Sequence, residues 1–179
     1  MHEIETKVLE VDGKILREKL EAFGAEQIQE VGLVVDWFSF ANVSKDDNPW
    51  FLRIRSYSTG KVEVTWKAKS DLIGVARKHK EINVIVDSHE KMQDMFIELG
   101  LVSYAHQEKN RVSWTLDNVQ FDFDTYPRMP SYLEIEAGSV DEINKMITML
   151  GLESHETWND GERTLIENKY KLNWSEMRF

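Results

Sequence analysis

Residues 121–136 read FDFDTYPRMPSYLEIE and hold two short runs in which a charged side chain alternates with an apolar one. Successive side chains of a β-strand point to opposite faces of a sheet, so residues two apart share a face. Asp122 and Asp124 therefore share one face of the first run, and Glu134 and Glu136 share one face of the second. The stretch predicts two strands, each with a pair of carboxylates on one face and an apolar surface on the other.

The same two-residue spacing of charges recurs in four other parts of the chain. The side chains are Glu3, Glu5 and Lys7; Arg53 and Arg55; Lys67 and Lys69; and Lys109 and Arg111. One interpretation is the solvent-exposed face of a half-buried antiparallel sheet. Such a face normally mixes Thr, Ser, Gln and Lys, whereas here six strands repeat a charge and each sign keeps largely to its own strand. The pattern favours charged faces that converge inside a barrel.

The overall composition excludes several classes of protein. The chain has 179 residues, 41% of them hydrophobic, which is enough for a core and unlike a disordered or collagen-like sequence. Its 22 basic and 32 acidic residues give a net charge of −10, the opposite sign to a protein that coats duplex nucleic acid. The absence of cysteine excludes disulfides, thiolate nucleophiles and cysteine-ligated zinc. No apolar stretch resembles a signal peptide or a membrane span, so we expect a cytoplasmic protein without a membrane partner.

Three helices are predicted from apolar residues at helical spacing and from signals at the helix ends. Side chains placed to accept a free backbone N–H at a helix start are Asp12, Ser88 and Ser139. Glu142 follows Ser139 by three residues, which is typical of a capping box. Glycines placed for the left-handed conformation just past a helix end are Gly24, Gly100 and Gly151.

The remaining segments are mostly strands. Residues 27–40 predict one long strand, and two hairpins are predicted at 50–58 with 61–69 and at 108–115 with 119–125. Residues 42–49 and 70–80 indicate polar loops, 160–172 a final helix, and 173–179 a frayed C-terminal tail. We therefore expect an α+β protein with one domain over residues 1–172, built around a large, curved antiparallel sheet or barrel.

Charged faces inside a barrel have a specific chemical meaning. Unpaired buried charges are prohibitively unfavourable, but an acidic wall that binds divalent cations and a basic wall that binds a polyanion are tolerable. Carboxylate oxygens are the ligands that Mg²⁺ and Mn²⁺ prefer. Arginine and lysine are the side chains that hold phosphate groups. The two walls together predict a metal-dependent site for a short chain of phosphates.

The charged motifs, in their order along the chain, resemble those of the CYTH superfamily, whose members are also called triphosphate tunnel metalloenzymes. The superfamily includes thiamine triphosphatases, inorganic triphosphatases and class IV adenylate cyclases. The similar positions are the ExExK strand Glu3-Ile4-Glu5-Thr6-Lys7, the RxR strand Arg53-Ile54-Arg55, Lys67, Glu81, Lys109-Asn110-Arg111, Asp122-Phe123-Asp124 and the ExE strand Glu134-Ile135-Glu136. The resemblance implies an eight-stranded antiparallel β-barrel, the triphosphate tunnel, with helices packed outside. It also implies a triphosphate held inside with one or two Mg²⁺ or Mn²⁺ ions. A basic residue of the C-terminal helix often reaches this tunnel, for which the candidates are Arg163, Lys169 and Lys171.

The resemblance leads us to expect a metal-dependent hydrolase of inorganic triphosphate, thiamine triphosphate or a nucleoside triphosphate. The expected metal ligands are Glu3, Glu5, Asp122, Asp124, Glu134 and Glu136. The expected phosphate-binding residues are Arg53, Arg55, Lys67, Lys69, Lys109 and Arg111. Lys7 is expected to orient the terminal phosphate or the attacking water, and Glu81 to orient the basic side chains. Replacing Glu134 or Glu136 by Ala is expected to abolish turnover and leave the fold intact.

Two alternatives share these residues. An adenylate cyclase would bind ATP in the same tunnel and form cyclic AMP and pyrophosphate. A binding module would hold polyphosphate or nucleotide without turnover. The partner expected in every case is a small-molecule triphosphate, and the chain is expected to be a monomer or a homodimer. Trp50 and Phe51 are candidates to stack on an organic group of the ligand, with a core role as the favoured alternative; Trp37 is expected to be strand core or outer packing.

Overall fold

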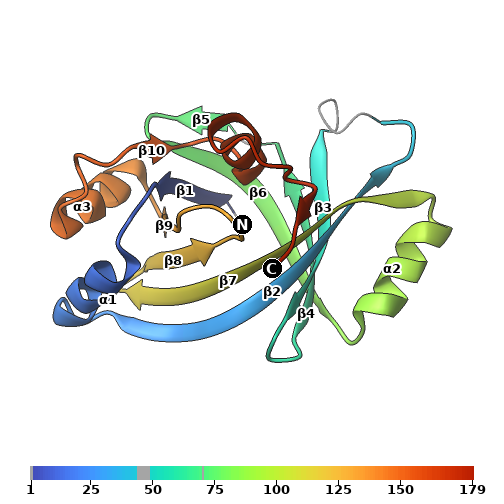
Figure 1. Ribbon diagram of the computed structural model, residues 1–179, viewed down its shortest axis with the longest axis horizontal. Coiled ribbons are helices and arrows are strands. Elements are labelled where there is room, and N and C mark those ends of the chain that lie inside the picture. Colours follow the sequence, from blue (N-terminus) through green and yellow to red (C-terminus); the bar gives the residue numbers. More distant parts are fainter. Residues whose placement is uncertain (1, 44–48, 70) are drawn as a thin grey trace.

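The computed structural model describes residues 2–43, 49–69 and 71–179, with side chains from residue 4 onward. Its central feature is a closed barrel of eight antiparallel strands (Figure 1). In order around the barrel they are β1 (His2–Val8), β9 (Tyr132–Ala137), β8 (Val119–Thr125), β7 (Leu101–Leu116), β2 (Glu26–Phe40), β3 (Trp50–Tyr57), β4 (Val62–Ala68) and β6 (Ala76–Val86). β1 closes the ring because it pairs with both β9 and β6. The predicted α+β fold with an eight-stranded antiparallel barrel is confirmed.

The long strands β2 and β7 give the barrel its curvature. They pair from Glu26 opposite Thr115 to Phe40 opposite Leu101. The register shifts between Gln27 and Gln29 and again between Trp37 and Phe38. Such irregularities bend a strand and increase its twist. Figure 1 shows the two strands as neighbouring curved ribbons.

Two helices cover the apolar outer faces of β8 and β9. They are α1 (Gly13–Ala22) and α3 (Val140–Leu150), which lie at the same end of the barrel (Figure 1). Their buried side chains join one hydrophobic cluster with Phe121, Phe123, Leu133 and Ile135, the apolar partners of the charged positions in these strands. The alternation in residues 121–136 therefore places one face against helices and the other inside the barrel.

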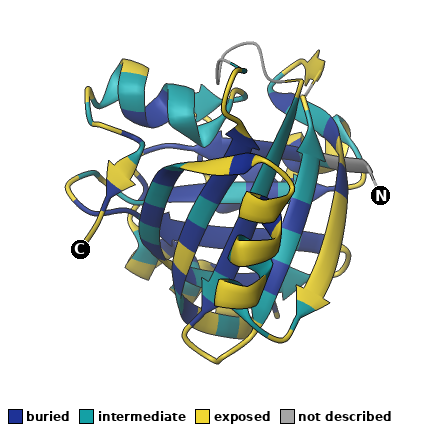
Figure 2. Cartoon of the chain, turned by 90° about the vertical axis from the view of Figure 1, so that its right-hand side faces the viewer, coloured by how far each residue is buried: buried dark blue, intermediate teal, exposed yellow. Residues whose placement is uncertain are grey.

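The helix α2 (His89–Glu98) lies across the outer face of the barrel on the opposite side (Figure 2). Its buried Phe96 packs on Phe38 of β2, with ring centroids 5.2 Å apart. The predicted helix ends are confirmed: Asp12, Ser88 and Ser139 accept backbone N–H groups, and Gly24, Gly100 and Gly151 have positive φ angles.

The prediction of a polar loop over residues 70–80 is wrong for the described residues 71–80. They form β5 (Asp71–Ile73), a two-residue turn and the first part of β6, the strand that closes the barrel by pairing with β1. The segment is polar because Arg77, His79 and Glu81 point to the charged inside of the barrel. A strand with a charged inner face has as many polar residues as a loop, so composition alone does not distinguish the two. Most of the other predicted loop, at 42–49, lies outside the described residues.

The C-terminal region differs from the prediction in two ways. The helix expected at 160–172 is a single turn, α4 (Glu162–Thr164), that continues as a π-helical turn, η1 (Leu165–Lys169), after the short strand β10 (Thr157–Trp158). Residues 173–179 are not frayed. Trp174 and Met177 are buried, and β11 (Glu176–Met177) pairs in parallel with β7. Burial of the Trp174 and Met177 side chains provides the hydrophobic free energy that holds this short segment on the barrel.

Candidate functional site

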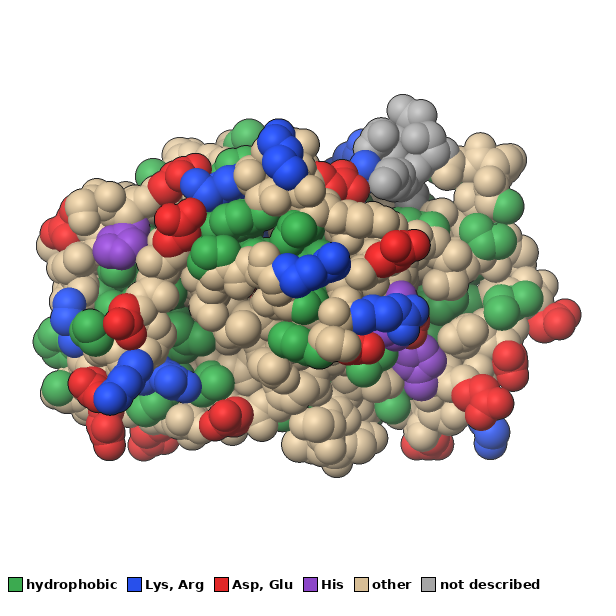
Figure 3. All heavy atoms as spheres, viewed as in Figure 1, with side chains coloured by type: hydrophobic (Ala, Val, Ile, Leu, Met, Phe, Trp, Pro, Cys, Tyr) green, Lys and Arg blue, Asp and Glu red, His purple; other side chains and the backbone are tan. Residues whose placement is uncertain are grey.

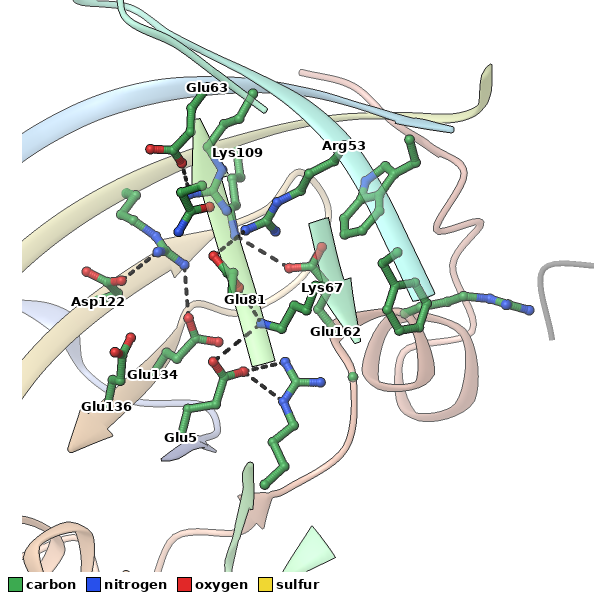
Figure 4. Close-up of a pocket in the computed structure, with 18 of the residues that line it drawn as sticks. Glu5, Arg53, Glu63, Lys67, Glu81, Lys109, Asp122, Glu134, Glu136 and Glu162 are labelled. Carbon is green, nitrogen blue, oxygen red and sulfur yellow. Dashed lines mark hydrogen bonds and ion pairs between the residues drawn. The ribbon is translucent and has the colours of Figure 1, made fainter. Parts of the chain in front are cut away.

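The barrel interior contains a cavity of about 370 Å³. Its charged lining consists of the cations Arg53, Arg55, Lys61, Lys67, Arg77, Lys109, Arg111 and Arg163 and the carboxylates Glu5, Glu63, Glu81, Asp122, Glu134, Glu136 and Glu162. Figure 4 shows Asp122, Glu134 and Glu136 on one side of this cavity, with Arg53 and Lys67 reaching in from the other.

The acidic side of the cavity follows from strand register. Asp122 stands opposite Glu134 across β8 and β9, and Glu5 stands opposite Glu136 across β1 and β9. Like charges directly opposite in a sheet destabilise it unless something compensates them. Burial raises the pKa of Asp122, assisted by the charges of Asp124 and Glu134 and opposed by Arg111. A hydrogen bond from the Ser113 side chain also opposes this rise.

Arg111 is the main compensating cation on this side. Its Nε donates to Asp124 Oδ1 at 2.6 Å, and its Nη1 donates to Asp122 Oδ2 at 2.5 Å. Its Nη2 lies 3.2 Å from Glu134 Oε1. Lys109 Nζ donates to Asp124 Oδ2 at 2.8 Å. Burial alone would raise the pKa of Asp124, but these two cations outweigh it and hold the pKa well below its usual range.

A second group of ion pairs joins β1, β4 and β6. Lys67 Nζ lies 3.2 Å from Glu81 Oε2, and Arg77 Nε donates to Glu5 Oε1 at 2.7 Å. Burial disfavours the charged form of Glu5, yet Arg77 and Lys67 outweigh this effect and keep its pKa well below the usual range. Burial also acts to raise the pKa of Glu81. The hydrogen bond from His79 and the charge of Lys67 outweigh burial and lower this pKa to about 2.

The structure brings ten of the predicted site residues to the cavity wall: Glu5, Arg53, Arg55, Lys67, Glu81, Lys109, Arg111, Asp122, Glu134 and Glu136. Lys7 and Asp124 are buried behind the wall and act on its side chains. Lys7 Nζ lies 3.0 Å from Glu134 Oε2 and 3.5 Å from Glu5 Oε1. Lys69 follows the end of β4, is exposed and does not line the cavity. The backbone of Glu3 lies in β1, but its side chain is outside the described part of the structure.

Several residues of the site are absent from the sequence-based prediction. Arg77 and His79 share the inner face of β6 with Glu81. Their two-residue spacing is the same signal that identifies the other charged strand faces, so the sequence pattern could have predicted them. Glu63 shares the inner face of β4 with Lys67 and lies 3.5 Å from Arg55 Nη1. Glu162 comes from α4 and lies 3.4 Å from Lys109 Nζ, and no local pattern points to it.

The donor chemistry of the acidic side fits a hard divalent cation. Asp122, Glu134 and Glu136 line the cavity and offer carboxylate oxygens, which are the ligands that Mg²⁺ and Mn²⁺ prefer. Within the described side chains, no three acidic or imidazole groups are already gathered in a ligand arrangement. The ion pairs account for this, because Glu5, Asp124 and Glu134 are each turned toward a cation.

Solved structures with this architecture come from several organisms. A protein from Pyrococcus horikoshii is 25% identical over 86% of this chain and 94% of its own, with a TM-score of 0.71. A candidate adenylate cyclase from Vibrio parahaemolyticus is 12% identical over 92% of this chain and 98% of its own, with a TM-score of 0.72. A candidate adenylyl cyclase from Hippeastrum, described as having a dominant triphosphatase activity, is 14% identical over 99% of both chains, with a TM-score of 0.68. The chain has the CYTH tunnel fold.

The tunnel fold is established by shape and not by sequence similarity. No model of a known protein family matches the chain, and no curated protein matches it. In the part of the chain that the structure describes, no helix is long and apolar enough to cross a membrane. On the face shown in Figure 3, acidic and basic side chains are interspersed. The reaction has to be argued from the tunnel itself.

Proposed function

We propose that the chain is a divalent-metal-dependent phosphohydrolase that cleaves triphosphate compounds inside the tunnel. The observation that carries this proposal is the meeting of two charge sets in one cavity, cations from β3, β4, β6 and β7 and carboxylates from β1, β8 and β9. Carboxylates would weaken a site for a bare anion, and arginines would weaken a site for a bare metal. Together they suit a complex of metal and polyphosphate. The triphosphatase activity described for the Hippeastrum protein of the same fold supports the proposal.

The ion pairs suggest how the site works. Arg53, Arg55 and Lys67 exchange their internal carboxylate partners for phosphate oxygens, the arginines by paired donors and the lysine as a point charge. Arg111 offsets the charge that develops in the transition state. One or two Mg²⁺ or Mn²⁺ ions, held by Asp122, Glu134 and Glu136, would supply a Lewis acid and a more acidic water.

Two residues act by positioning other groups. Glu81 lies 3.2 Å from Lys67 and 3.9 Å from Arg53, and its low pKa keeps it ionised at neutral pH. It therefore holds both cations toward the cavity before the substrate arrives. Lys7 has no surface on the cavity, so it positions Glu134 and Glu5 and does not contact phosphate.

A matched pair of lysines tests the site. Lys67 and Lys69 are two residues apart, but only Lys67 lines the cavity. We expect Lys67→Met to lower kcat/KM for triphosphate hydrolysis by about 10²-fold, since a charged hydrogen bond to phosphate contributes about 1.5–3 kcal/mol. Lys69→Met is expected to change it less than about twofold. The measurement is orthophosphate release from tripolyphosphate, thiamine triphosphate and ATP with Mg²⁺ or Mn²⁺. Equal effects of the two substitutions would contradict the assignment of this cavity as the site.

The same assay separates the alternatives. Cyclic AMP and pyrophosphate from ATP would support the adenylate cyclase reaction, which is favoured by the likeness to the candidate cyclase from Vibrio parahaemolyticus. Tight binding of tripolyphosphate without any phosphate release would support the binding module. Orthophosphate as the released product supports the hydrolase.

A further inference from the structure

The second half of β6 has one edge without a neighbouring strand. Along one side, β6 pairs with β4 from Glu81 to Val86. Along the other side it pairs with β1 only from Arg77 to Lys80, because β1 begins at His2, opposite Lys80. Within the described residues, no strand pairs with this side of residues 82–86. We call these five residues the β6 edge. The free backbone N–H and C=O groups of such an edge are a template for another strand.

The sequence of the β6 edge favours strand pairing. It reads Ile82-Asn83-Val84-Ile85-Val86, which is rich in β-branched residues and has no charge and no proline. Soluble proteins usually protect an exposed edge with a lysine, a proline or a bulge. None of these is present, and the register with β4 runs from Val86 to Glu81 without a shift. Ile82, Val84 and Ile85 are 48%, 52% and 60% exposed. An edge this regular and apolar is suited to a partner strand.

The outer face of β4 extends this apolar surface. Trp66 lies opposite Ile82, and Val64 lies opposite Val84, in directly paired positions of the two strands. Both β4 side chains are only partly buried. A strand added to the β6 edge therefore gains apolar cross-strand neighbours on the outer side in addition to main-chain hydrogen bonds.

The charges at the two ends of the β6 edge indicate its occupant. Lys80 is exposed just before the edge, and Asp87 and Glu90 are exposed just after it. When two copies of this edge run antiparallel about a two-fold axis, the Lys80 end of each copy lies beside the acidic end of the other. The edge itself is uncharged, so two chains of net charge −10 meet there without bringing acidic residues face to face. The edge is therefore complementary to itself.

We propose that the β6 edge is a dimerisation surface on which two copies of this chain pair their β6 strands antiparallel. A two-fold axis at Val84 places the two Val84 side chains opposite each other, and Ile82 of one copy opposite Val86 of the other. Asn83 of the same edge lines the cavity, so the contact lies beside the tunnel wall of each copy. The proposal goes beyond the proposed function and does not depend on which reaction the tunnel performs.

Matched valine variants test the surface. We expect the wild-type protein to sediment as a dimer that dissociates on dilution. Val84→Lys places two like charges opposite each other at the two-fold axis and should raise the dimer dissociation constant by at least about 100-fold. Val102→Lys is the control, because Val102 is also exposed, at 42%, but lies in β7. It should leave the dissociation constant unchanged. Thermal melting of both variants shows that they remain folded.

A charge exchange tests the antiparallel arrangement. Lys80→Glu places like charges together at both ends of the contact and should raise the dissociation constant about tenfold. Adding Asp87→Lys to this variant restores opposite charges, so the double variant should return to within about threefold of the wild-type value. Hydrogen exchange gives a direct readout. The free amide groups of residues 82–86 should be protected in the dimer and should lose this protection on dilution or in Val84→Lys.

Each outcome decides for or against the β6 edge. A wild-type protein that stays monomeric at every concentration, with fast exchange at residues 82–86, would overturn the proposal. A dimer that Val84→Lys and Val102→Lys affect equally would have its interface elsewhere and would overturn it too. A double variant that binds no more tightly than Lys80→Glu would contradict the antiparallel pairing. Loss of the dimer in Val84→Lys alone, with concentration-dependent protection of the β6 edge in the wild-type protein, supports the proposal.

Discussion

At the scale of single residues, the tunnel is neutralised from within. Arg111 contacts Asp122, Asp124 and Glu134, and Lys7 joins Glu134 to Glu5. Removing one partner of a buried ion pair is strongly destabilising because it leaves the other charge without compensation. The carboxylates of one wall are therefore not equivalent, although the sequence presents them as a uniform set.

Glu134 and Glu136 show the difference. Glu134 is the nearest partner of Lys7, which is only 1% exposed, so Glu134→Ala should lower the free energy of unfolding by about 3 kcal/mol. Glu136→Ala leaves the ion pair between Lys7 and Glu134 in place, so it should lower the free energy of unfolding by a smaller amount, about 1 kcal/mol. Both substitutions should abolish metal-dependent turnover. Urea denaturation of the two variants measures the free energies, and equal stabilities would contradict the pairing of Lys7 with Glu134 as the source of the difference.

The buried lysine refines the sequence-based expectation for these variants: both are still expected to fold, but Glu134→Ala is expected to be the less stable of the two. That expectation considered only repulsion among carboxylates, which removal of one would relieve. The structure adds Lys7, whose charge is compensated by Glu134 at 3.0 Å and by Glu5 at 3.5 Å. At Glu136, relief of the repulsion from Glu5 offsets part of the loss, whereas at Glu134 the loss of a partner for Lys7 outweighs it.

At the scale of elements, two short segments complete the tunnel. The first half of β6 brings Arg77 to Glu5 and closes the barrel. The C-terminal segment brings Trp174 to the cavity and is fixed to β7 through β11. Both segments look unstructured by composition, and both contribute side chains to the site.

A substitution in β11 tests whether the C-terminal segment is part of the fold. Met177 is fully buried, so Met177→Asp would place a carboxylate in an apolar environment and should lower the free energy of unfolding by about 3 kcal/mol. Arg178→Ala, at the exposed neighbouring position, is the control and should change it by less than about 0.5 kcal/mol. Denaturant titrations measure both values. If Met177→Asp were as stable as the control, residues 173–179 would be a frayed tail after all.

At the scale of the whole molecule, the buried ion pairs make stability depend on pH. The folded pKa values of Glu5, Glu81 and Asp124 are lower than in an unfolded chain, so the folded state binds fewer protons at low pH. Groups of this kind stabilise the protein above their unfolded pKa, and the stabilisation is lost as pH falls through the folded pKa. Asp122 acts in the opposite direction because burial raises its pKa.

For Glu81 the pH window is explicit. Its pKa is about 2 in the folded protein and about 4.3 in an unfolded chain. We expect the free energy of unfolding to be nearly constant from pH 7 to about 5 and to fall steeply between about pH 4.3 and 2. Denaturant titrations at pH 7, 5, 4 and 3 measure the profile. In Glu81→Gln the free energy of unfolding should fall less steeply below about pH 4.3. An unchanged pH dependence in that variant would show that other groups cause the fall.

The local pattern of the sequence determined the strands, their inner faces and the helix ends. Alternation in residues 121–136 identifies the charged and apolar faces of β8 and β9, because a strand repeats every two residues whatever its neighbours are. Ser139 and Gly151 mark the two ends of α3 because capping involves only adjacent backbone groups. The ordered charge motifs, through the resemblance they carry, also predicted the closed barrel and ten residues of its cavity wall.

Only the tertiary structure decided which charge meets which, and which further segments enter the tunnel. Glu5 of β1 and Arg77 of β6 pair although they are 72 residues apart in the sequence. No local periodicity predicts this pairing. Lys67 faces the cavity and Lys69 does not, because β4 ends between them at Ala68. Glu162 and Trp174 reach the cavity because the C-terminal segment docks on the barrel through a few buried side chains. The physical reason is that the free energy of an ion pair or an aromatic contact depends on distance in space. Closure of the barrel sets that distance, whereas alternation along one strand does not.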